Sequence, residues 1–327
     1  MQDFFDLGTR IQAVDRRAFL ASAAAAALVP RAAAAAGPIV LVTADLEARL
    51  VAVDLRRGRV VRRIRTLPFP RSIETVGTTA VVAHSELGAV SLVQGPSLAV
   101  ARVLRGFGEP RYTAAHPDGR HAYVTDAARG EVVALDVVRG RVLGRARVGP
   151  RARHVTIDPR GRTLWVALGS KAEEIAVVDV SERARPRLVR RFRPPFLAHD
   201  VAWTPDGRRV WVSSGNRWQL AVYDALTGRV LARPYGDWPP QHVTFAAGRV
   251  YVTSGWSGTL HVHRVDGRPL ARTVVPVGSY NVQQADGWVL TPSLGHGNLC
   301  VLDAAGKVLR SEKVARSSHD ACVVTAA

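Results

Sequence analysis

Seven pairs of mainly polar residues recur along the chain about forty residues apart, and four of its ten histidines stand in these pairs. The pairs are Arg71-Ser72, Arg111-Tyr112, Arg153-His154, His199-Asp200, Gln241-His242, Tyr280-Asn281 and His319-Asp320. Imidazole, carboxylate and guanidinium groups can hold a metal ion, bind an anion or exchange protons when a fold brings them together. Such chemistry therefore requires an architecture that repeats with the same period.

A turn signature with that period indicates the architecture. Residues 117–120 read Pro-Asp-Gly-Arg, close copies stand at 159–162 and 205–208, and weaker copies follow at 247–249 and 286–288. Short β-branched or aromatic runs, which suit strands, begin at residues 40, 80, 122, 164, 210, 250 and 288. A period near forty residues, with strands between the turns, is typical of a β-propeller with one blade per repeat.

The count of innermost strands predicts how the ring closes. Six of the seven runs follow an innermost strand, whereas the run at residue 40 has none before it and a spare strand stands at residues 321–325. We therefore expect an all-β fold, a seven-bladed propeller of four-stranded blades, in which the C-terminal strand completes blade one and closes the ring. The alternative, an open sandwich of short strands, does not account for these complementary ends.

The blade pattern places the seven polar pairs at one mouth of the central channel. Each pair stands where an innermost strand begins, and the loops between second and third strands share that face. These loops add His84, Trp218, Trp256 and His296. The expected ligand-binding residues are Arg111, Tyr112, Arg153, His154, His199, Asp200, Trp218, His242, Trp256, Tyr280, His319 and Asp320.

A divalent metal ion is one ligand that this mouth could hold. We expect His199, His242 and His319 to bind it, with Asp200 and Asp320 orienting imidazoles or neutralising the cation. The alternative is that each histidine only satisfies a neighbouring carbonyl in a water-filled channel. The opposite mouth, formed by the Pro-Asp-Gly turns, is expected to offer no comparable set.

The repeated motifs resemble those of the YVTN family of bacterial propellers. Residues 123–126 read Tyr-Val-Thr-Asp and residues 251–254 read Tyr-Val-Thr-Ser, and the Pro-Asp-Gly and Asp-x-x-x-Gly turns also match. The resemblance covers residues 39 to 327 and implies a seven-bladed fold. Because the family includes surface-layer proteins, subunits of amine dehydrogenases and proteins of unknown role, and its motif residues build strands and turns, it implies no catalytic residue.

The N-terminal segment is expected to be an export signal. Residues 15–20, Asp-Arg-Arg-Ala-Phe-Leu, resemble a twin-arginine signal, and Ala34-Ala35-Ala36 before Gly37 fits a signal-peptidase site. The apolar stretch between them is too short for a transmembrane helix. We expect a signal peptide at residues 1–36, one propeller domain at residues 37–327, and a periplasmic or extracellular location. The alternative is an N-terminal helix of the domain.

The charge of the chain suggests an anionic partner. Lysine and arginine number 45 against 27 acidic residues, for a net charge of +18. A solvated basic rim and an attraction to an anionic ligand or cell-surface polymer both fit this excess. Nucleic acid is a poor candidate for an exported protein, and we expect a monomer. Cys300 and Cys322 are expected to be separate buried thiols, because they fall on strands of different blades.

Three classes of function remain open from the sequence. The first is a binding propeller that recognises a small molecule or a protein at the mouth. The second is an enzyme at the same mouth, either a metal-assisted hydrolase or lactonase, or a cofactor-bearing oxidoreductase subunit. The third is a structural module of the cell surface. The sequence contains no Gly-x-Ser-x-Gly elbow, phosphate-binding loop or Cys-x-x-Cys-His haem attachment.

Overall fold

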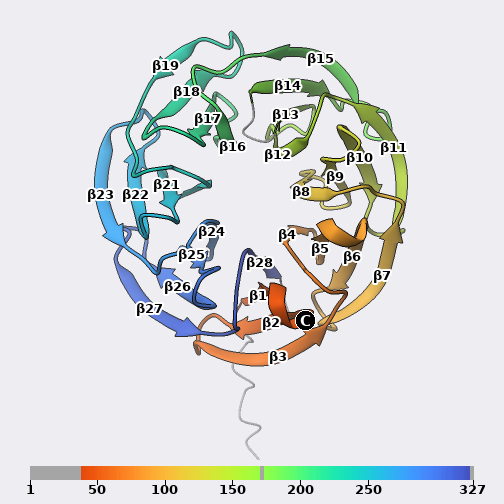
Figure 1. The fold of residues 1–327 in the computed structure, drawn as a ribbon, viewed down its shortest axis with the longest axis vertical. Coiled ribbons are helices and arrows are strands. Elements are labelled where there is room, and N and C mark those ends of the chain that lie inside the picture. The colour runs from red at the N-terminus through yellow and green to blue at the C-terminus, as the bar shows by residue number, and fades with distance from the viewer. Residues whose placement is uncertain (1–37, 170–172, 325–327) are drawn as a thin grey trace, which may run out of the picture. The chain divides into compact units, whose positions relative to one another are not determined.

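Seven four-stranded antiparallel sheets surround a central axis in the computed structural model (Figure 1), which describes residues 38–169 and 173–324. The expected signal peptide, residues 1–36, lies outside the described residues. The seven-bladed all-β fold is therefore as the repeat predicted. Within the described part of the chain, no helix is long and apolar enough to cross a membrane.

Each blade is one sheet whose four strands succeed one another from the channel outward. Blade one contains β28 (Ala321–Val324), β1 (Ile39–Ala44), β2 (Arg49–Asp54) and β3 (Arg59–Arg65). Blade two contains β4 (Ser72–Val76), β5 (Thr79–His84), β6 (Ala89–Gln94) and β7 (Ala99–Arg105). Blade three contains β8 (Pro110–Ala115), β9 (His121–Asp126), β10 (Glu131–Asp136) and β11 (Arg141–Arg147). Blade four contains β12 (Ala152–Ile157), β13 (Thr163–Leu168), β14 (Glu174–Asp179) and β15 (Arg187–Phe192).

The remaining three blades have the same plan. Blade five contains β16 (Ala198–Trp203), β17 (Arg209–Ser214), β18 (Leu220–Asp224) and β19 (Val230–Ala232). Blade six contains β20 (Val243–Ala246), β21 (Arg249–Ser254), β22 (Thr259–Arg264) and β23 (Pro269–Val274). Blade seven contains β24 (Gln283–Ala285), β25 (Trp288–Pro292), β26 (Asn298–Leu302) and β27 (Val308–Lys313).

The C-terminal strand closes the ring, as predicted. β28 pairs antiparallel with β1, with Val324 opposite Ile39 and Ala321 opposite Val42. The Thr43 amide also donates to the Asp320 carbonyl at 2.9 Å. Blade one thus consists of two segments from opposite ends of the described chain, and its inner edge is covered.

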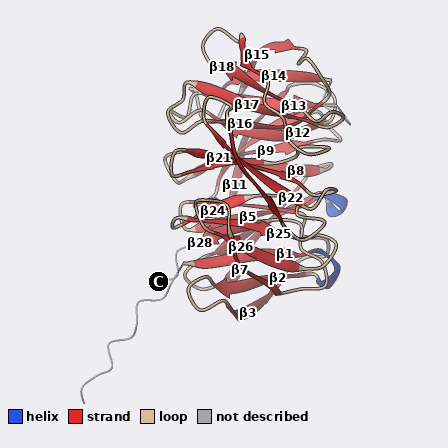
Figure 2. Cartoon of the chain, turned by 90° about the vertical axis from the view of Figure 1, so that its left-hand side faces the viewer, coloured by secondary structure: helices blue, strands red, loops and turns tan. Residues whose placement is uncertain are grey.

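The two short 3-10 helices mark one face of the ring. They are η1 (Asp45–Glu47) and η2 (Ser85–Leu87), which join the second and third strands of blades one and two. Figure 2 shows both on the same side. Asp45 in η1 pairs with Arg71, where β4 begins, at 3.3 Å between Nη1 and Oδ2. The innermost strands therefore begin on this side, which we call the entrance face.

Hydroxyl groups at the ends of second strands join one blade to the next. Thr125 Oγ1 donates to the Arg153 carbonyl of blade four at 2.6 Å. The threonine of the Tyr-Val-Thr pattern is thus an inter-blade hydrogen-bond donor as well as a strand former. The same bond joins Ser213 to Gln241 and Thr253 to Tyr280.

The hydrophobic core lies between neighbouring blades. Trp165 of blade four packs edge-on against Phe192 and Tyr223, with ring centroids 5.2 and 5.6 Å away, in a cluster that extends to Val201 of blade five. Outer strands such as β3 are mostly exposed and rich in arginine. Cys300 and Cys322 are separate buried thiols, as the sequence favoured.

The Pro-Asp-Gly turns require glycine. Gly119 has a φ of +66° and Gly161 a φ of +70°, in the left-handed region that disfavours other residues. A Cβ at Gly161 would also stand 2.3 Å from His116 Nε2. The recurrent glycine thus permits both the tight turn and the close packing of adjacent blades.

Candidate functional site

Four aromatic side chains from four blades meet at the entrance mouth of the channel. Tyr112, His154, His199 and His242 come from the beginnings of the innermost strands of blades three to six, with His242 directly preceding β20. The Tyr112 and His154 rings stack with centroids 3.9 Å apart, and His154 lies 4.6 Å from His199 and 4.7 Å from His242. Residues that are 42 to 45 positions apart therefore share one site, because the blade repeat brings the beginnings of these strands together.

The three imidazoles among these rings have the arrangement of a metal-ligand set. One ring nitrogen from each of His154, His199 and His242 lies within 4.8 Å of the others. An imidazole that binds zinc places its ring nitrogen about 2.0–2.1 Å from the ion. His154 is 2% exposed, and among the described residues its Nε2 has no hydrogen-bond partner.

The third expected metal ligand, His319, lies outside the closest group of imidazoles. His319 does not join this trio, and His154 takes its place. His319 Nδ1 instead donates to the Arg71 carbonyl at 2.8 Å, while its own carbonyl accepts from Asn281 Nδ2 at 2.7 Å. His319 therefore links blades seven, one and two.

Burial keeps the three clustered imidazoles neutral. Desolvation, followed by the neighbouring histidines, holds the pKa of His154 well below its usual range. Desolvation and Arg153 lower the pKa of His199 to about 3, and desolvation also lowers that of His242. Neutral imidazole is the form that ligates a metal ion, so no proton has to be displaced at neutral pH.

Asp200 and Asp320 hold blades together from within the channel. Asp200 Oδ2 accepts from the Val243 amide of blade six at 3.0 Å, and Asp320 Oδ2 accepts from the Ile73 amide of blade two at 3.0 Å. Burial raises the pKa of Asp200 to about 7 and that of Asp320 well above its usual value. Asp200 Oδ2 is also 3.5 Å from His242 Nδ1, so it can orient that imidazole.

The channel below the histidines contains a small polar cavity that adds an unexpected carboxylate. The cavity has a volume of about 160 Å³, and Glu74 lines it together with Asp200 and Asp320. Burial raises the pKa of Glu74 to about 7. Glu74 stands two residues beyond a polar pair, where a strand residue facing the channel would be found, and this alternation was the signal that could have identified it.

Arginines occupy the part of the entrance face that belongs to blades two to four. Arg71 and Arg111 pair with Asp45 and Glu109 at 3.3 and 3.0 Å. Arg153 stands directly before His154 and is partly buried. The expected arginines therefore lie on one side of the histidine cluster.

Exposed aromatic rings occupy the part of the entrance face that belongs to blades five to seven. Trp218 and Trp256 are 57% and 66% exposed, in the loops where they were expected. Trp256 lies 6.1 Å from Tyr280, and Trp218 lies 6.5 Å from Trp238, which the sequence had not indicated. Trp238 belongs to the connection between β19 and β20, whose conformation the repeat does not predict.

The remaining loop histidines of the entrance face have separate surroundings. His84 is buried, with Nδ1 2.9 Å from the Pro68 carbonyl and Nε2 3.0 Å from Ser91 Oγ. His296 is exposed in the loop before β26. His84 thus only satisfies neighbouring groups, which was the alternative considered for the channel histidines.

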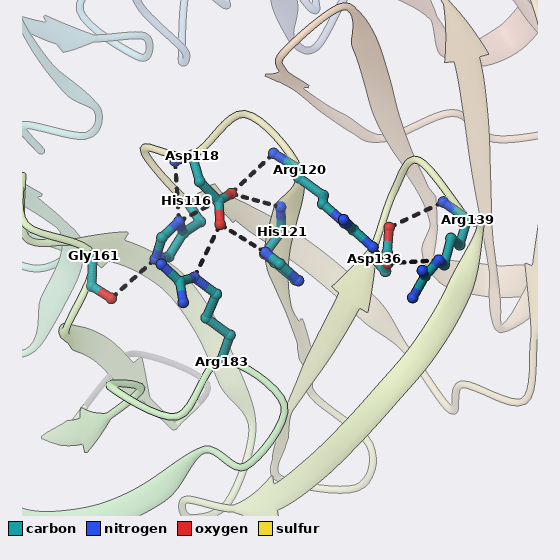
Figure 3. Close-up of polar contacts among 8 residues, drawn as sticks. All are labelled: His116, Asp118, Arg120, His121, Asp136, Arg139, Gly161 and Arg183. Carbon is teal, nitrogen blue, oxygen red and sulfur yellow. Dashed lines mark hydrogen bonds and ion pairs between the residues drawn. The ribbon is translucent and has the colours of Figure 1, made fainter.

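The opposite face carries a polar cluster around the Pro-Asp-Gly turn of blade three. Asp118 accepts from His121 Nδ1 at 2.7 Å and pairs with Arg183 Nε at 3.0 Å and His116 Nδ1 at 3.0 Å (Figure 3). His116 Nε2 lies 3.2 Å from the Gly161 carbonyl. Because these groups satisfy one another across blades three and four, the cluster is structural. The aspartate of the Pro-Asp-Gly signature therefore does more than form a turn.

Comparisons with known proteins show the fold alone. No protein-family model and no curated protein sequence matches the chain. It is similar to hydrazine synthase of Kuenenia stuttgartiensis, with a TM-score of 0.73, 17% identity and coverage of 82% of this chain and 92% of that one. A functionally unknown protein from Desulfotomaculum acetoxidans DSM 771 has a TM-score of 0.76 at 12% identity, covering 88% and 99%. The dihydro-heme d1 dehydrogenase NirN has a TM-score of 0.63 at 18% identity; 84% of this chain is covered, but only 63% of the NirN chain.

Proposed function

We propose that the protein is a binding propeller whose entrance mouth holds a divalent transition-metal ion on His154, His199 and His242 and recognises a ligand beside it. The observation that carries this proposal is the convergence of three ring nitrogens within 4.8 Å, from three different blades. A buried His154 Nε2 without a partner among the described residues supports it further, since buried polar atoms are normally satisfied. Imidazole ligands suit zinc, copper, nickel and iron.

The surroundings of the trio support ligand recognition. Arg111 and Arg153 would attract an anionic group, and Trp218 and Trp256 offer exposed ring faces. A ligand carrying both an anionic group and an apolar or ring-shaped body would use both parts of the entrance face. The proposed function is therefore binding at the mouth rather than catalysis.

Metal titration tests the proposal. Metal-free protein titrated with Co²⁺, followed by visible absorption, and with Zn²⁺, followed by calorimetry, is expected to bind one equivalent. His199→Ala should weaken Co²⁺ binding at least about 100-fold, because even the loss of a group that only orients a ligand costs about 10- to 100-fold. His199 is only partly buried, so this variant should remain folded.

His319→Gln is the matched control for the metal site. The His319 side chain contacts the Arg71 carbonyl instead of the trio, so the Co²⁺ affinity of this variant should differ from that of the wild type by less than about threefold. If neither metal binds, or if His319→Gln loses as much affinity as His199→Ala, the proposed trio is wrong.

A metal-assisted hydrolase is the second candidate, favoured by the number of ligands. Three imidazoles leave coordination positions for water and substrate, as catalytic zinc sites do. Turnover of a panel of simple lactones by the metal-loaded protein, lost in His199→Ala, would favour the enzyme. Bound metal without turnover would favour the binding function.

We further propose that the protein is exported and related to the YVTN propellers. The Tyr-Val-Thr runs and the twin-arginine pattern support this proposal. Changing Arg16 and Arg17 to lysine should retain the precursor in the cytoplasm, as cell fractionation would measure, whereas Arg10→Lys should leave export unchanged. Normal export of the double variant, or a mature protein that begins at Met1, would contradict the signal.

A further inference from the structure

A cavity of about 710 Å³ opens on the entrance face between blades three and four. Its walls are the loop between β9 and β10, the connection between β11 and β12, and part of β15. Four arginines line it, against one acidic residue, Glu109. We name this cavity and its inward extension the arginine groove. The arginines of the larger cavity are Arg129, Arg147, Arg151 and Arg191.

The groove leads toward the histidine cluster. A second cavity of about 140 Å³ is lined by Arg111, Arg151 and Arg153 and shares Glu109 and Ala127 with the larger one. Arg153 directly precedes His154 in β12. Cationic side chains therefore line a path from the outer strand of blade four to the mouth of the channel.

Two arginines of the groove are available for a ligand. Arg129 donates to the Gly106 carbonyl at 2.7 Å, and Arg191 lies 3.4 Å from Glu174. The side chains of Arg147 and Arg151 are exposed, and neither has an ion pair or hydrogen bond to another described residue. Guanidinium groups without an acidic partner favour a bound carboxylate or phosphate.

The backbone at Arg151 points to the same use. Its φ is +49°, in the left-handed region where glycine is preferred and a long side chain is unusual. Such backbone strain occurs preferentially at binding sites, where the surrounding structure maintains it. The residue with the strained backbone is the one arginine that lines both cavities.

We propose that the arginine groove binds an organic anion with at least two carboxylate or phosphate groups. Arg147 and Arg151 hold one anionic group, and Arg111 and Arg153 hold the other, next to the imidazoles. Ala127, Val148 and Leu188 provide an apolar wall for the body of the ligand. The cavity volume suits a small molecule of this kind. This inference names the class of ligand that the proposed binding function would recognise. It rests on that proposed function only for the statement that the ligand reaches the mouth of the channel.

Two probes distinguish the sources of the anionic groups. Citrate represents polycarboxylates and tripolyphosphate represents polyphosphates, and each is titrated calorimetrically into metal-free protein at low salt. We expect at least one probe to bind with a Kd below about 100 µM and to bind more weakly as salt is added. If neither binds more tightly than about 1 mM, the proposal is wrong.

Charge-matched variants locate the binding. Arg147→Gln with Arg151→Gln should weaken binding of the probe at least about tenfold. Arg160→Gln with Arg162→Gln removes the same charge from exposed residues at the turn between β12 and β13, on the opposite face of the same blade, and should change the Kd less than about twofold. An equal loss of probe affinity in both double variants would overturn the proposed binding in the arginine groove and indicate a general effect of net charge.

Arg151→Gly separates binding from folding. Glycine accepts the positive φ, so this variant should melt no lower than the wild type while its probe affinity falls. An unchanged affinity would contradict the assignment. These titrations use metal-free protein, so their outcome does not change if the proposed metal site is wrong. Co²⁺ binding likewise does not change if the proposed arginine groove is wrong.

Discussion

A chain that ends at Arg316 is expected to lose cooperative folding. It lacks β28, and with it the partner of β1 over four register positions and the buried side chains of Ala321, Cys322 and Val324. Blade one would then expose an inner edge, which promotes association with other chains. The net stability of a folded protein is only about 5–15 kcal/mol, so we expect loss of the ring rather than a small shift. Urea denaturation and size-exclusion chromatography measure this outcome.

A chain that ends at Val324 is the matched control for the truncation. It retains β28 and should unfold in a single transition like the full chain. A synthetic peptide of residues 317–327 should restore a single unfolding transition to the truncated protein by supplying the strand in trans. If the protein that ends at Arg316 denatures at the same urea concentration as the full chain, the closing role of β28 is refuted.

Acid is expected to destabilise the propeller partly through His263. This side chain is completely buried between blades five and six, with its ring 5.7 Å from Trp211 and 5.9 Å from His261. Desolvation, followed by the nearby His261, lowers the pKa of His263 to about 4. The unfolded chain binds a proton near its ordinary value of 6.5, so the stability that His263 contributes is present above pH 6.5 and lost as the pH falls toward 4.

Replacement of His263 measures this contribution. His263→Leu removes the titrating group. The free energy of unfolding of this variant minus that of the wild type should therefore be about 2 kcal/mol larger at pH 5 than at pH 8. His263→Phe has a different packing cost but should show the same pH-dependent gain. Urea denaturation of both variants at the two pH values provides the comparison. An unchanged difference between variant and wild type would show that the pKa of His263 is not lowered in the fold.

The repeat made the fold predictable from the sequence. Turn signatures, strand runs and the missing first inner strand are local features, yet their common period predicted seven blades and closure by residues 321–325, of which the structure describes β28 as Ala321–Val324. The same register predicted that His154, His199 and His242 would meet, because the innermost strands of all blades begin around the same mouth of the channel. Neither result required knowledge of individual side-chain contacts.

Side-chain direction was not predictable in the same way. His319 and His199 are both the first residue of their polar pairs, but Asn281 and the Arg71 carbonyl hold His319 away from the trio. Asp200 and Asp320 likewise bind amides of the next blade, a role that depends on the exact approach of two strands. The arginine groove and Trp238 depend on loops, whose conformations the strand pattern does not determine.

Blade one combines strands from both ends of the described chain, and this affects the order in which the blades assemble during synthesis. Thr43 and Asp320, which hydrogen-bond to each other, are 277 residues apart, so β1 is made long before its inner partner leaves the ribosome. Contacts between such distant residues form slowly, because a long chain must be ordered first. Blades two to seven can each assemble from consecutive residues as they emerge. The ring is therefore completed only after the other blades have been made, and until then the chain carries an unpaired strand that a chaperone could recognise.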